Sequence, residues 1–368
     1  MAQLDIEGLC KGWDFPVIDR LDLSVKEGEF FVIVGPSGIG KTTLLRLVAG
    51  LERPDAGRIA VGGEDVTTRP PYRRPVAMTF ESYALYPHLT VFENIASPLR
   101  ARRLAKAQVR QRVQAVAELL RIDALLNRYP GEVSGGQKQR TALGRTLVSE
   151  PEVFLLDEPL SHLDAKIRHE LRQQFHTLEA LRTVATLYVT HDYAEALSLG
   201  DRIGVMGAGG LVQVGAAREV FERPANLFVA QHLGQPSINT LQVKLGEENG
   251  ALMARSNGGL MLPVARMHVQ GLAHEGNGAA ILGIRPQHIR VCTAGESSYG
   301  GDCVVDAQVE LFEALGAVGV LVASVQAERL TALTSPDRMF APGQSIELRL
   351  NPDAFLYFAS DSGDNLFA

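Results

Sequence analysis

The 368-residue sequence has few cysteines, one tryptophan and no long apolar run. The three cysteines, Cys10, Cys292 and Cys303, are odd in number and lack metal-ligand spacing, so we expect reduced thiols in a cytosolic protein. The longest apolar stretch, residues 316–325, has about half of the ~18 residues that a membrane-spanning helix needs, and we expect a buried strand there. The first residues also lack the charged-then-apolar pattern of a signal peptide. We therefore expect neither a disulfide-rich secreted protein nor a chain with its own membrane span.

The sequence also lacks an excess of basic residues, internal repeats and low-complexity segments. It has 36 Lys and Arg against 42 Asp and Glu, a net charge of -6, whereas general nucleic-acid binders carry a basic face. We therefore expect no nucleic-acid partner. Apolar residues make up 46% and charged residues 21%, which is a normal globular balance, and the length suits two domains.

The pattern of predicted secondary structure changes at about residue 235. Residues 1–235 alternate β-rich runs, such as "FFVIV" and "VFLLD", with helical stretches, which predicts a mostly parallel sheet. Within this part, residues 89–150 are mainly helical and predict a helical subdomain. Residues 236–368 contain short strand-like pieces separated by Gly, Asn, Pro and Asp, which predict a small all-β barrel. The predicted fold is an α/β domain followed by an all-β domain.

The most specific motif is "GPSGIGKTT", which fits G-x-x-x-x-G-K-[ST] between a predicted strand and a predicted helix. In such a loop, backbone N–H groups wrap phosphate oxygens, the lysine adds a full positive charge and the hydroxyl can hold Mg2+. The alternative is a chance glycine-rich turn. We interpret the motif as a nucleotide site made of Gly35, Pro36, Ser37, Gly38, Ile39, Gly40, Lys41, Thr42 and Thr43.

Two further motifs bear on the same chemistry. In "VFLLDEP" an apolar strand ends in Asp157, which can support Mg2+, and Glu158, which can polarise an attacking water; the alternative is a helix cap. In "VSGGQKQR" a glycine-rich turn, Ser134 to Gln137, runs into a helix and forms a second potential anion site, with a plain N-cap as the alternative.

The order and spacing of the P-loop, "SGGQ", "LLDEP", "SHLD" and "VTHD" resemble those of ATP-binding cassette (ABC) ATPases. Residues 4–240 are similar to the ATPase subunits of carbohydrate importers of the maltose and glycerol-3-phosphate type. "LGIRPQHI" resembles the regulatory domain appended to those subunits. The resemblance implies an α/β P-loop ABC ATPase domain with a helical subdomain, followed by a small all-β OB-like domain of the TOBE type.

The resemblance also implies ATP and Mg2+ as cofactors and a role for each motif residue. Trp13, the only tryptophan, falls where an aromatic ring stacks on adenine, although a core position is the alternative. Thr42 and Asp157 support the metal, and Glu158 acts as general base. His191 of "VTHD" senses the γ-phosphate.

In this family a second copy of the chain completes each site. Ser134, Gly135, Gly136 and Gln137 of one copy close over ATP on the P-loop of the other, and Asp164 of "SHLD" also belongs to the nucleotide site. The resemblance therefore implies a homodimer through an ATP sandwich and through the C-terminal domains.

The implied membrane partners are two permease subunits that dock near residues 81–88, and a solute-binding protein that acts through them. The chain is then a peripheral protein on the cytoplasmic face of the inner membrane. The implied solute is a sugar, glycoside, polyol or glycerol phosphate, with a polyamine or iron importer as the alternative. A soluble ABC ATPase acting on ribosomes or DNA, and a regulatory module with secondary ATPase activity, are the competing functions.

Several positions depart from the family pattern, among them Ile39 of the P-loop, and Glu81 changes the charge at the site itself. Glu81 in "FESYALYPH" stands where the family has glutamine, whose oxygen reaches Mg2+ and the attacking water. Glu81 brings a negative charge beside Asp157 and Glu158, and a bound Mg2+ offsets that charge. Our hypothesis is that Glu81 stays a catalytic and metal-facing residue but makes the site more dependent on Mg2+, with a near-neutral variant as the alternative.

Overall fold

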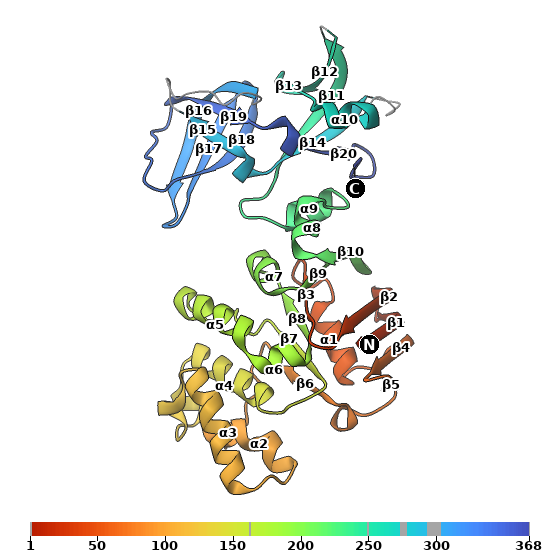
Figure 1. Ribbon diagram of the computed structural model, residues 1–368, viewed down its shortest axis with the longest axis vertical. Coiled ribbons are helices and arrows are strands. Elements are labelled where there is room, and N and C mark those ends of the chain that lie inside the picture. The colour runs from red at the N-terminus through yellow and green to blue at the C-terminus, as the bar shows by residue number, and fades with distance from the viewer. Residues whose placement is uncertain (1, 162, 249, 273–277, 293–302, 368) are drawn as a thin grey trace. The chain divides into compact units, whose positions relative to one another are not determined.

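The computed structural model describes residues 2–161, 163–248, 250–272, 278–292 and 303–367, so His162 of "SHLD" lies outside the described residues (Figure 1). The chain divides into two compact units, Met1–Val220 and Phe221–Ala368. The domain boundary between residues 235 and 236 stays a sequence-based prediction. Among the described residues, no helix is both long enough and apolar enough to cross a membrane.

A six-stranded sheet forms the centre of the first unit. The strand order is β10-β9-β3-β8-β7-β6, and every neighbouring pair is parallel except β9 and β10. Strands β3, β7 and β8 are buried along their whole length, as expected of parallel strands covered on both faces. The bounds are β3 (Phe30–Val34), β6 (Val76–Thr79), β7 (Val153–Asp157), β8 (Ala185–Thr190), β9 (Arg202–Gly207) and β10 (Gly210–Ala216).

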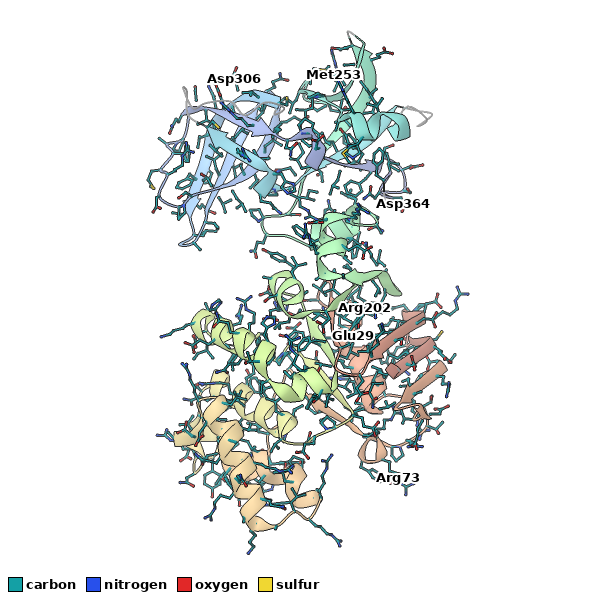
Figure 2. The ribbon with its side chains drawn as sticks, in the orientation of Figure 1. Glu29, Arg73, Arg202, Met253, Asp306 and Asp364 are labelled. Atoms are coloured by element: carbon teal, nitrogen blue, oxygen red, sulfur yellow. The ribbon has the colours of Figure 1, made fainter. Side chains whose placement is uncertain are left out.

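The register of this sheet places three motifs at one edge. Val34 pairs with Thr190, and Asp157 pairs with Val189, so β3, β7 and β8 end level with one another. Ligands bind outside the carboxyl ends of such strands. An ion pair of 3.0 Å between buried Glu29 and Arg202 joins the starts of β3 and β9, and Figure 2 labels both side chains.

A second, antiparallel sheet of the first unit was not predicted from the sequence. Its order is β2-β1-β4-β5, from β1 (Ala2–Gly12), β2 (Pro16–Lys26), β4 (Ala56–Val61) and β5 (Glu64–Asp65). Helix α1 (Lys41–Ala49) contributes its leucines to a core that also contains side chains from both sheets. This core fixes the helix that follows the P-loop.

Three helices occupy residues 91–147, where a helical subdomain was predicted: α2 (Val91–Ala101), α3 (Lys106–Leu119) and α4 (Gly135–Leu147). They pack closely, because a Cβ on Gly144 of α4 would lie only 3.2 Å from side-chain atoms of Leu120 and Val116. The helical stretch after β7 is interrupted, since α5 (Ala165–Thr177) and α6 (Glu179–Thr183) are separated by Leu178 in extended conformation. Helix α7 (Tyr193–Leu199) follows β8.

The second unit consists mainly of antiparallel strands. Two five-stranded sheets, ordered β13-β12-β11-β14-β20 and β15-β19-β16-β17-β18, share one apolar core. The predicted buried strand is β17, but only alternate side chains are fully buried because one face is partly exposed. The sequence did not predict helix α10 (Arg266–Leu272). The strand bounds are β11 (Asn239–Glu248), β12 (Ala251–Ser256), β13 (Met261–Pro263), β14 (Ala279–Ile284), β15 (Ile289–Cys292), β16 (Cys303–Ala314), β17 (Gly319–Val325), β18 (Glu328–Thr334), β19 (Ser345–Leu350) and β20 (Leu356–Ala359); α8 (Ala217–Glu222) and α9 (Leu227–His232) precede them.

Candidate functional site

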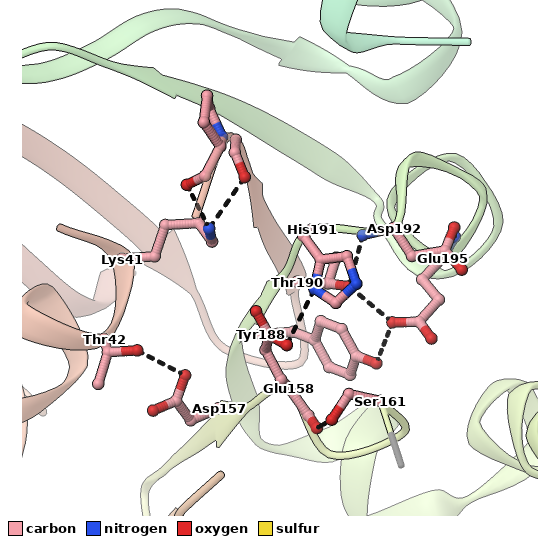
Figure 3. Close-up of polar contacts among 12 residues, drawn as sticks. Lys41, Thr42, Asp157, Glu158, Ser161, Tyr188, Thr190, His191, Asp192 and Glu195 are labelled. Atoms are coloured by element: carbon pink, nitrogen blue, oxygen red, sulfur yellow. Dashed lines mark hydrogen bonds and ion pairs between the residues drawn. The ribbon is translucent and has the colours of Figure 1, made fainter. Parts of the chain in front are cut away.

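The P-loop connects β3 to α1 and holds its lysine in a buried position. A Cβ on Gly35 would lie 2.5 Å from the Met206 carbonyl oxygen, so a larger residue does not fit there. Lys41 is 4% exposed, and its Nζ donates to the carbonyl oxygens of Gly35 at 2.9 Å and Pro36 at 2.8 Å (Figure 3). Burial lowers the pKa of Lys41, while Glu158, Asp157 and Glu81 act in the opposite direction. The loop therefore presents a partly desolvated ammonium group to three carboxylates.

Thr42 and Asp157 bring oxygen atoms together at the start of α1. Thr42 Oγ1 donates to Asp157 Oδ1 at 3.1 Å, and Asp157 is 2% exposed (Figure 3). Burial raises the pKa of Asp157 to about 6; the Thr42 hydrogen bond opposes this, and the charges of Glu158 and Glu81 add to it. A cation near this carboxylate would oppose the shift, because opposite charge favours the ionised form.

Glu158 and His191 form a second polar pair, in addition to Thr42 and Asp157. His191 Nδ1 lies 2.9 Å from Glu158 Oε2 (Figure 3). Glu158 has a left-handed backbone with φ 45°, which is strained for a residue other than glycine. Its carbonyl oxygen accepts hydrogen bonds from Gln139 Nε2 at 3.0 Å and Ser161 Oγ at 2.9 Å. These bonds hold the strained turn that aims the carboxylate.

A buried network holds the turn that carries His191. Tyr188 Oη and Thr190 Oγ1 donate to Glu195 Oε2 at 2.7 and 2.9 Å, and Thr190 Oγ1 in turn accepts from the Asp192 backbone N–H at 2.9 Å (Figure 3). Glu195 is 3% exposed, and burial raises the pKa of its carboxyl group. The residues on both sides of His191 are thus tied to one side chain of α7.

Lys41, Thr42, Glu158 and His191 line a cavity of about 430 Å³, whereas Asp157 stands behind Thr42 and is not part of the lining. Glu81, which follows β6, faces the same space, and its charge acts on both Lys41 and Asp157. The cavity therefore combines groups from four strand ends. Its lining residues are Ser37, Gly38, Gly40, Lys41, Thr42, Thr43, Glu81, Glu158, Ser161 and His191.

Other predicted site residues lie elsewhere on the first unit. Trp13 occupies the turn between β1 and β2, is 59% exposed and has Lys11 Nζ 5.3 Å from its ring centroid, which contradicts the alternative of a core tryptophan. Ser134 and Gln137 cap α4 reciprocally, and Asp164 caps α5 through Ile167 N–H at 3.0 Å. None of these residues is among the described residues that line the cavity.

Several residues that support the site were not predicted from the sequence. Ser161 lines the cavity, and Gln139, which is 4% exposed, bonds to the Glu158 carbonyl. Both lie in motifs that also contain predicted site residues, "SHLD" and "SGGQKQR", but their contacts reach across the fold. Asn94 was missed as well: its Nδ2 donates to the carbonyl oxygens of Tyr86, Leu89 and Thr90 at 3.0–3.1 Å.

The aromatic loop after Glu81 is held from two sides. Tyr83 and Ala84 have left-handed backbones, with φ 65° and 45°. Arg145 donates to their carbonyl oxygens at 3.0 and 2.6 Å, and Asn94 fixes the other end of the loop. Beside it lies a second cavity of about 610 Å³, lined by residues of β6, the loop, α2 and α4.

Comparison with known proteins assigns each part of the chain. The ABC transporter family model matches residues 18–161, the MalK OB fold domain model matches residues 234–289, and the TOBE domain model matches residues 282–358. The sn-glycerol-3-phosphate import ATP-binding protein UgpC of Yersinia pseudotuberculosis is 42% identical over 99% of both chains. The uncharacterized ABC transporter ATP-binding protein YurJ of Bacillus subtilis is 40% identical over 100% of both chains.

A solved structure extends the comparison to a nucleotide-bound state. The dimeric ATP-binding cassette MJ0796, in a post-hydrolysis state bound to ADP and Pi, is 27% identical, with a TM-score of 0.55. The match covers 58% of this chain and 99% of that chain. These findings confirm the predicted fold class and the predicted resemblance to import ATPase subunits. The chain belongs to the ABC transporter family, as an ATP-binding, ATP-hydrolysing subunit with a MalK-type OB fold and a TOBE domain.

Proposed function

We propose that this chain is the ATP-hydrolysing motor of an ABC importer for a sugar, polyol or glycerol-phosphate type of solute. The observation that carries the proposal is the single cavity that joins Lys41 and Thr42 of the P-loop to Glu158, His191 and Glu81. Full-length likeness to sn-glycerol-3-phosphate import ATP-binding proteins supports the same conclusion. The identity of the solute rests on those relatives alone.

The residues of the cavity take distinct roles in this proposal. The P-loop N–H groups and Lys41 bind the phosphates of ATP, and Trp13 stacks on the adenine. Glu158 takes the proton of the attacking water, and His191, hydrogen-bonded to Glu158, contacts the γ-phosphate. Glu195 holds the residues flanking His191 and so fixes the backbone that carries the ring.

The residues present also fit Mg2+. Thr42, Asp157 and Glu81 offer oxygen ligands, which hard cations prefer. The described part of the chain has no group of three or more His, Cys, Asp or Glu side chains that could hold an ion, so phosphate and water would have to complete the ligand set. Bound Mg2+ would neutralise phosphate charge and offset the cluster of Asp157, Glu158 and Glu81. With this metal, Glu81 is tolerated; without it, Glu81 opposes nucleotide binding.

The signature segment serves a second copy of the chain. Ser134 and Gly135 are exposed at the N-terminus of α4, and a helix N-terminus suits phosphate. In a head-to-tail dimer, Ser134–Gln137 and Asp164 of each copy approach ATP on the other. ATP then favours the closed dimer, hydrolysis releases it, and the C-terminal units add to the dimer contact.

The aromatic loop and its neighbouring cavity form the docking site for two permease subunits. Tyr83, Tyr86, Pro87 and His88 stand directly after Glu81, so movement at the loop reaches the nucleotide site through one short segment. The chain is then a peripheral protein at the cytoplasmic membrane face. A solute-binding protein acts through the permeases and selects the solute.

Reconstitution tests the whole proposal. The full chain, placed in proteoliposomes with its permease subunits and their solute-binding protein, is expected to drive uptake of radiolabelled sn-glycerol 3-phosphate or a sugar when ATP is inside. Lys41→Ala should abolish uptake, whereas Lys26→Ala on an exposed strand position should not. Purification of the chain with ribosomes instead of permeases, or uptake without ATP, would refute the assignment.

A further inference from the structure

The second unit contains its own cavity, of about 560 Å³, a volume typical of small-molecule sites. All of its lining residues lie within Phe221–Ala368. They come from the end of α8, from α10, from residues 285–288, from residues 353–357 before and within β20, and from the last described residues of the chain. The cavity therefore shares no lining residue with the nucleotide site.

Two buried polar atoms in this cavity have no partner. His268 is 8% exposed and Tyr357 is 0% exposed, and neither His268 Nδ1 nor the Tyr357 hydroxyl has a hydrogen-bond partner within the described part of the chain. The two rings stand edge to face, with centroids 5.4 Å apart. Buried polar groups are almost always hydrogen-bonded, so a bound molecule is the natural source of the missing bonds. We call these two atoms, His268 Nδ1 and the Tyr357 hydroxyl oxygen, the polar centre of the cavity.

Aromatic rings surround this polar centre. Phe367 lies 4.5 Å from the His268 ring and 6.1 Å from the Tyr357 ring, measured between centroids. Phe221 and Phe355 also line the cavity. These walls suit the C–H faces of a small molecule, while the hydroxyl and imidazole groups bind its polar edge.

The charges around the cavity balance. Arg223 and Arg285 carry two positive charges, and Glu222 and Asp353 carry two negative ones. Buried Arg285 already donates to the carbonyl oxygens of Leu233 and Phe221, and its guanidinium lies 3.8 Å from the Phe221 ring centroid. A bound anion would be repelled by Glu222 and Asp353, and a bound cation would be repelled by the two arginines. The cavity lining therefore favours neither sign of charge in a ligand.

The histidines add no charge near neutral pH. Burial lowers the pKa of His268 and of His288, with Asp353 opposing the shift at His268 and Arg285 adding to it at His288. A neutral imidazole nitrogen and a tyrosine hydroxyl are matched by a ligand hydroxyl, which donates and accepts at once.

We propose that this cavity binds an uncharged, polyhydroxylated solute of monosaccharide to disaccharide size. Hydroxyl groups of the solute bond to His268 Nδ1 and the Tyr357 hydroxyl, and its apolar face packs on Phe367. The site lies outside the catalytic unit, so it extends the proposed function by adding a sensor of neutral solute and does not depend on it.

Calorimetric titration of the full chain without nucleotide tests the proposal through matched pairs of probes. D-glucose and maltose are expected to bind with one site per chain at concentrations up to about 10 mM. Glucose 6-phosphate, which differs from glucose by a charged group, should bind at least tenfold more weakly. Absence of binding by both neutral sugars, or equal binding of the phosphorylated one, would overturn the proposal.

A conservative variant distinguishes a cavity that binds a ligand from a cavity that holds only water. Tyr357→Phe removes only the unpartnered hydroxyl, and it should weaken binding of the neutral sugar at least tenfold while leaving the melting temperature of the sugar-free chain unchanged or higher. Tyr72→Phe, at a residue 81% exposed in the other unit, is the matched control and should change neither quantity. Unchanged affinity in Tyr357→Phe, or a lower melting temperature without sugar, would show that the hydroxyl serves the fold through water alone.

Discussion

Each unit has a cavity lined by polar side chains, and the polar groups of these two cavities differ in their hydrogen bonding. In the first unit Lys41 bonds to loop carbonyls, Thr42 to Asp157, and His191 to Glu158. In the second unit His268 Nδ1 and the Tyr357 hydroxyl have no partner among the described residues. An unpaired buried charge costs several kcal/mol, whereas a neutral polar atom costs about 1–3 kcal/mol. Catalytic charges are therefore held in internal pairs, while neutral groups can be left open for a ligand.

The largest expected effect separates the two cavities by activity. Glu158→Gln removes the proposed general base and should lower the ATPase rate by roughly 10²–10⁴-fold, because the proton of the attacking water then has no acceptor. Tyr357→Phe should leave the sugar-free rate within about twofold, since it touches no atom of the catalytic unit's cavity. Phosphate release by the purified chain measures both. The control is Glu27→Gln at an exposed position, and a near-normal rate in Glu158→Gln would remove the assigned role.

The next effect tests whether the nucleotide cavity is completed by a partner. In the Glu158→Gln background, Gly135→Asp should abolish the ATP-induced dimer, because its carboxylate repels the γ-phosphate of the facing copy. ATP binding by the monomer should remain, since Gly135 does not line its own cavity. Light scattering after gel filtration reports the dimer, and calorimetry reports the binding.

Gly131→Asp is the matched control for this test, because a Cβ there meets nothing within 4 Å. It should dimerise normally. A loss of monomer affinity in Gly135→Asp would indicate instead that the signature segment acts on its own chain.

A smaller effect concerns the unusual carboxylate. Glu81→Gln removes a charge beside Asp157 and the phosphates, so the ratio of ATP affinities with and without Mg2+ should fall roughly tenfold. ATPase rates across a Mg2+ titration, with the permeases present, measure the same change in activity. Superimposable curves for the two proteins would show that Glu81 is a neutral replacement of glutamine.

The smallest effect is an opposite response of the two units to acid. Burial raises the pKa of Glu195, so its contribution to stability is present below its unfolded value of 4.5 and lost as pH rises through the folded value. Burial lowers the pKa of His268, so its contribution is present above 6.5 and lost as pH falls through the folded value. Calorimetric scans between pH 7 and pH 5 should show this in two matched variants.

His268→Phe is expected to reduce the acid-induced fall in melting temperature of the second unit by about 2–4 °C. Glu195→Gln, which keeps an acceptor for Tyr188 and Thr190, should change the pH profile of the first unit in the opposite sense. Identical profiles for wild type and both variants would show that neither group is linked to folding.

The nucleotide site was predictable because each of its parts is a contiguous motif. The P-loop, Asp157 with Glu158, and His191 all directly follow apolar strands, and parallel pairing brings those strand ends together. The strand-helix alternation therefore predicted the α/β fold class, while the motifs, and for Glu81 and His191 the family resemblance, predicted residues that line the cavity. Glu81 was noticeable for the same reason, since it stands in a loop whose other residues match the family.

Residues that act through long-range contacts were not predicted from the sequence. Gln139 and Ser161 both donate hydrogen bonds to the Glu158 carbonyl, and Asn94 bonds to the aromatic loop. No spacing of residues in the sequence predicts either contact. The extended conformation of Leu178 divides a stretch that reads as one helix. The antiparallel sheet of β1, β2, β4 and β5 was missed because its pairing depends on the shared core rather than on any motif.

The sequence by itself predicted the α/β and all-β division and the candidate catalytic groups, because local patterning sets strands, helices and phosphate-binding turns and because the motifs resemble those of a known family. Only the tertiary structure decided that Trp13 is exposed and that the signature residues stand apart from their own P-loop. It alone brought His268 to Tyr357 inside an aromatic cavity. The reason is physical: periodicity encodes which face a residue buries, but the partner it meets there depends on how separate segments pack.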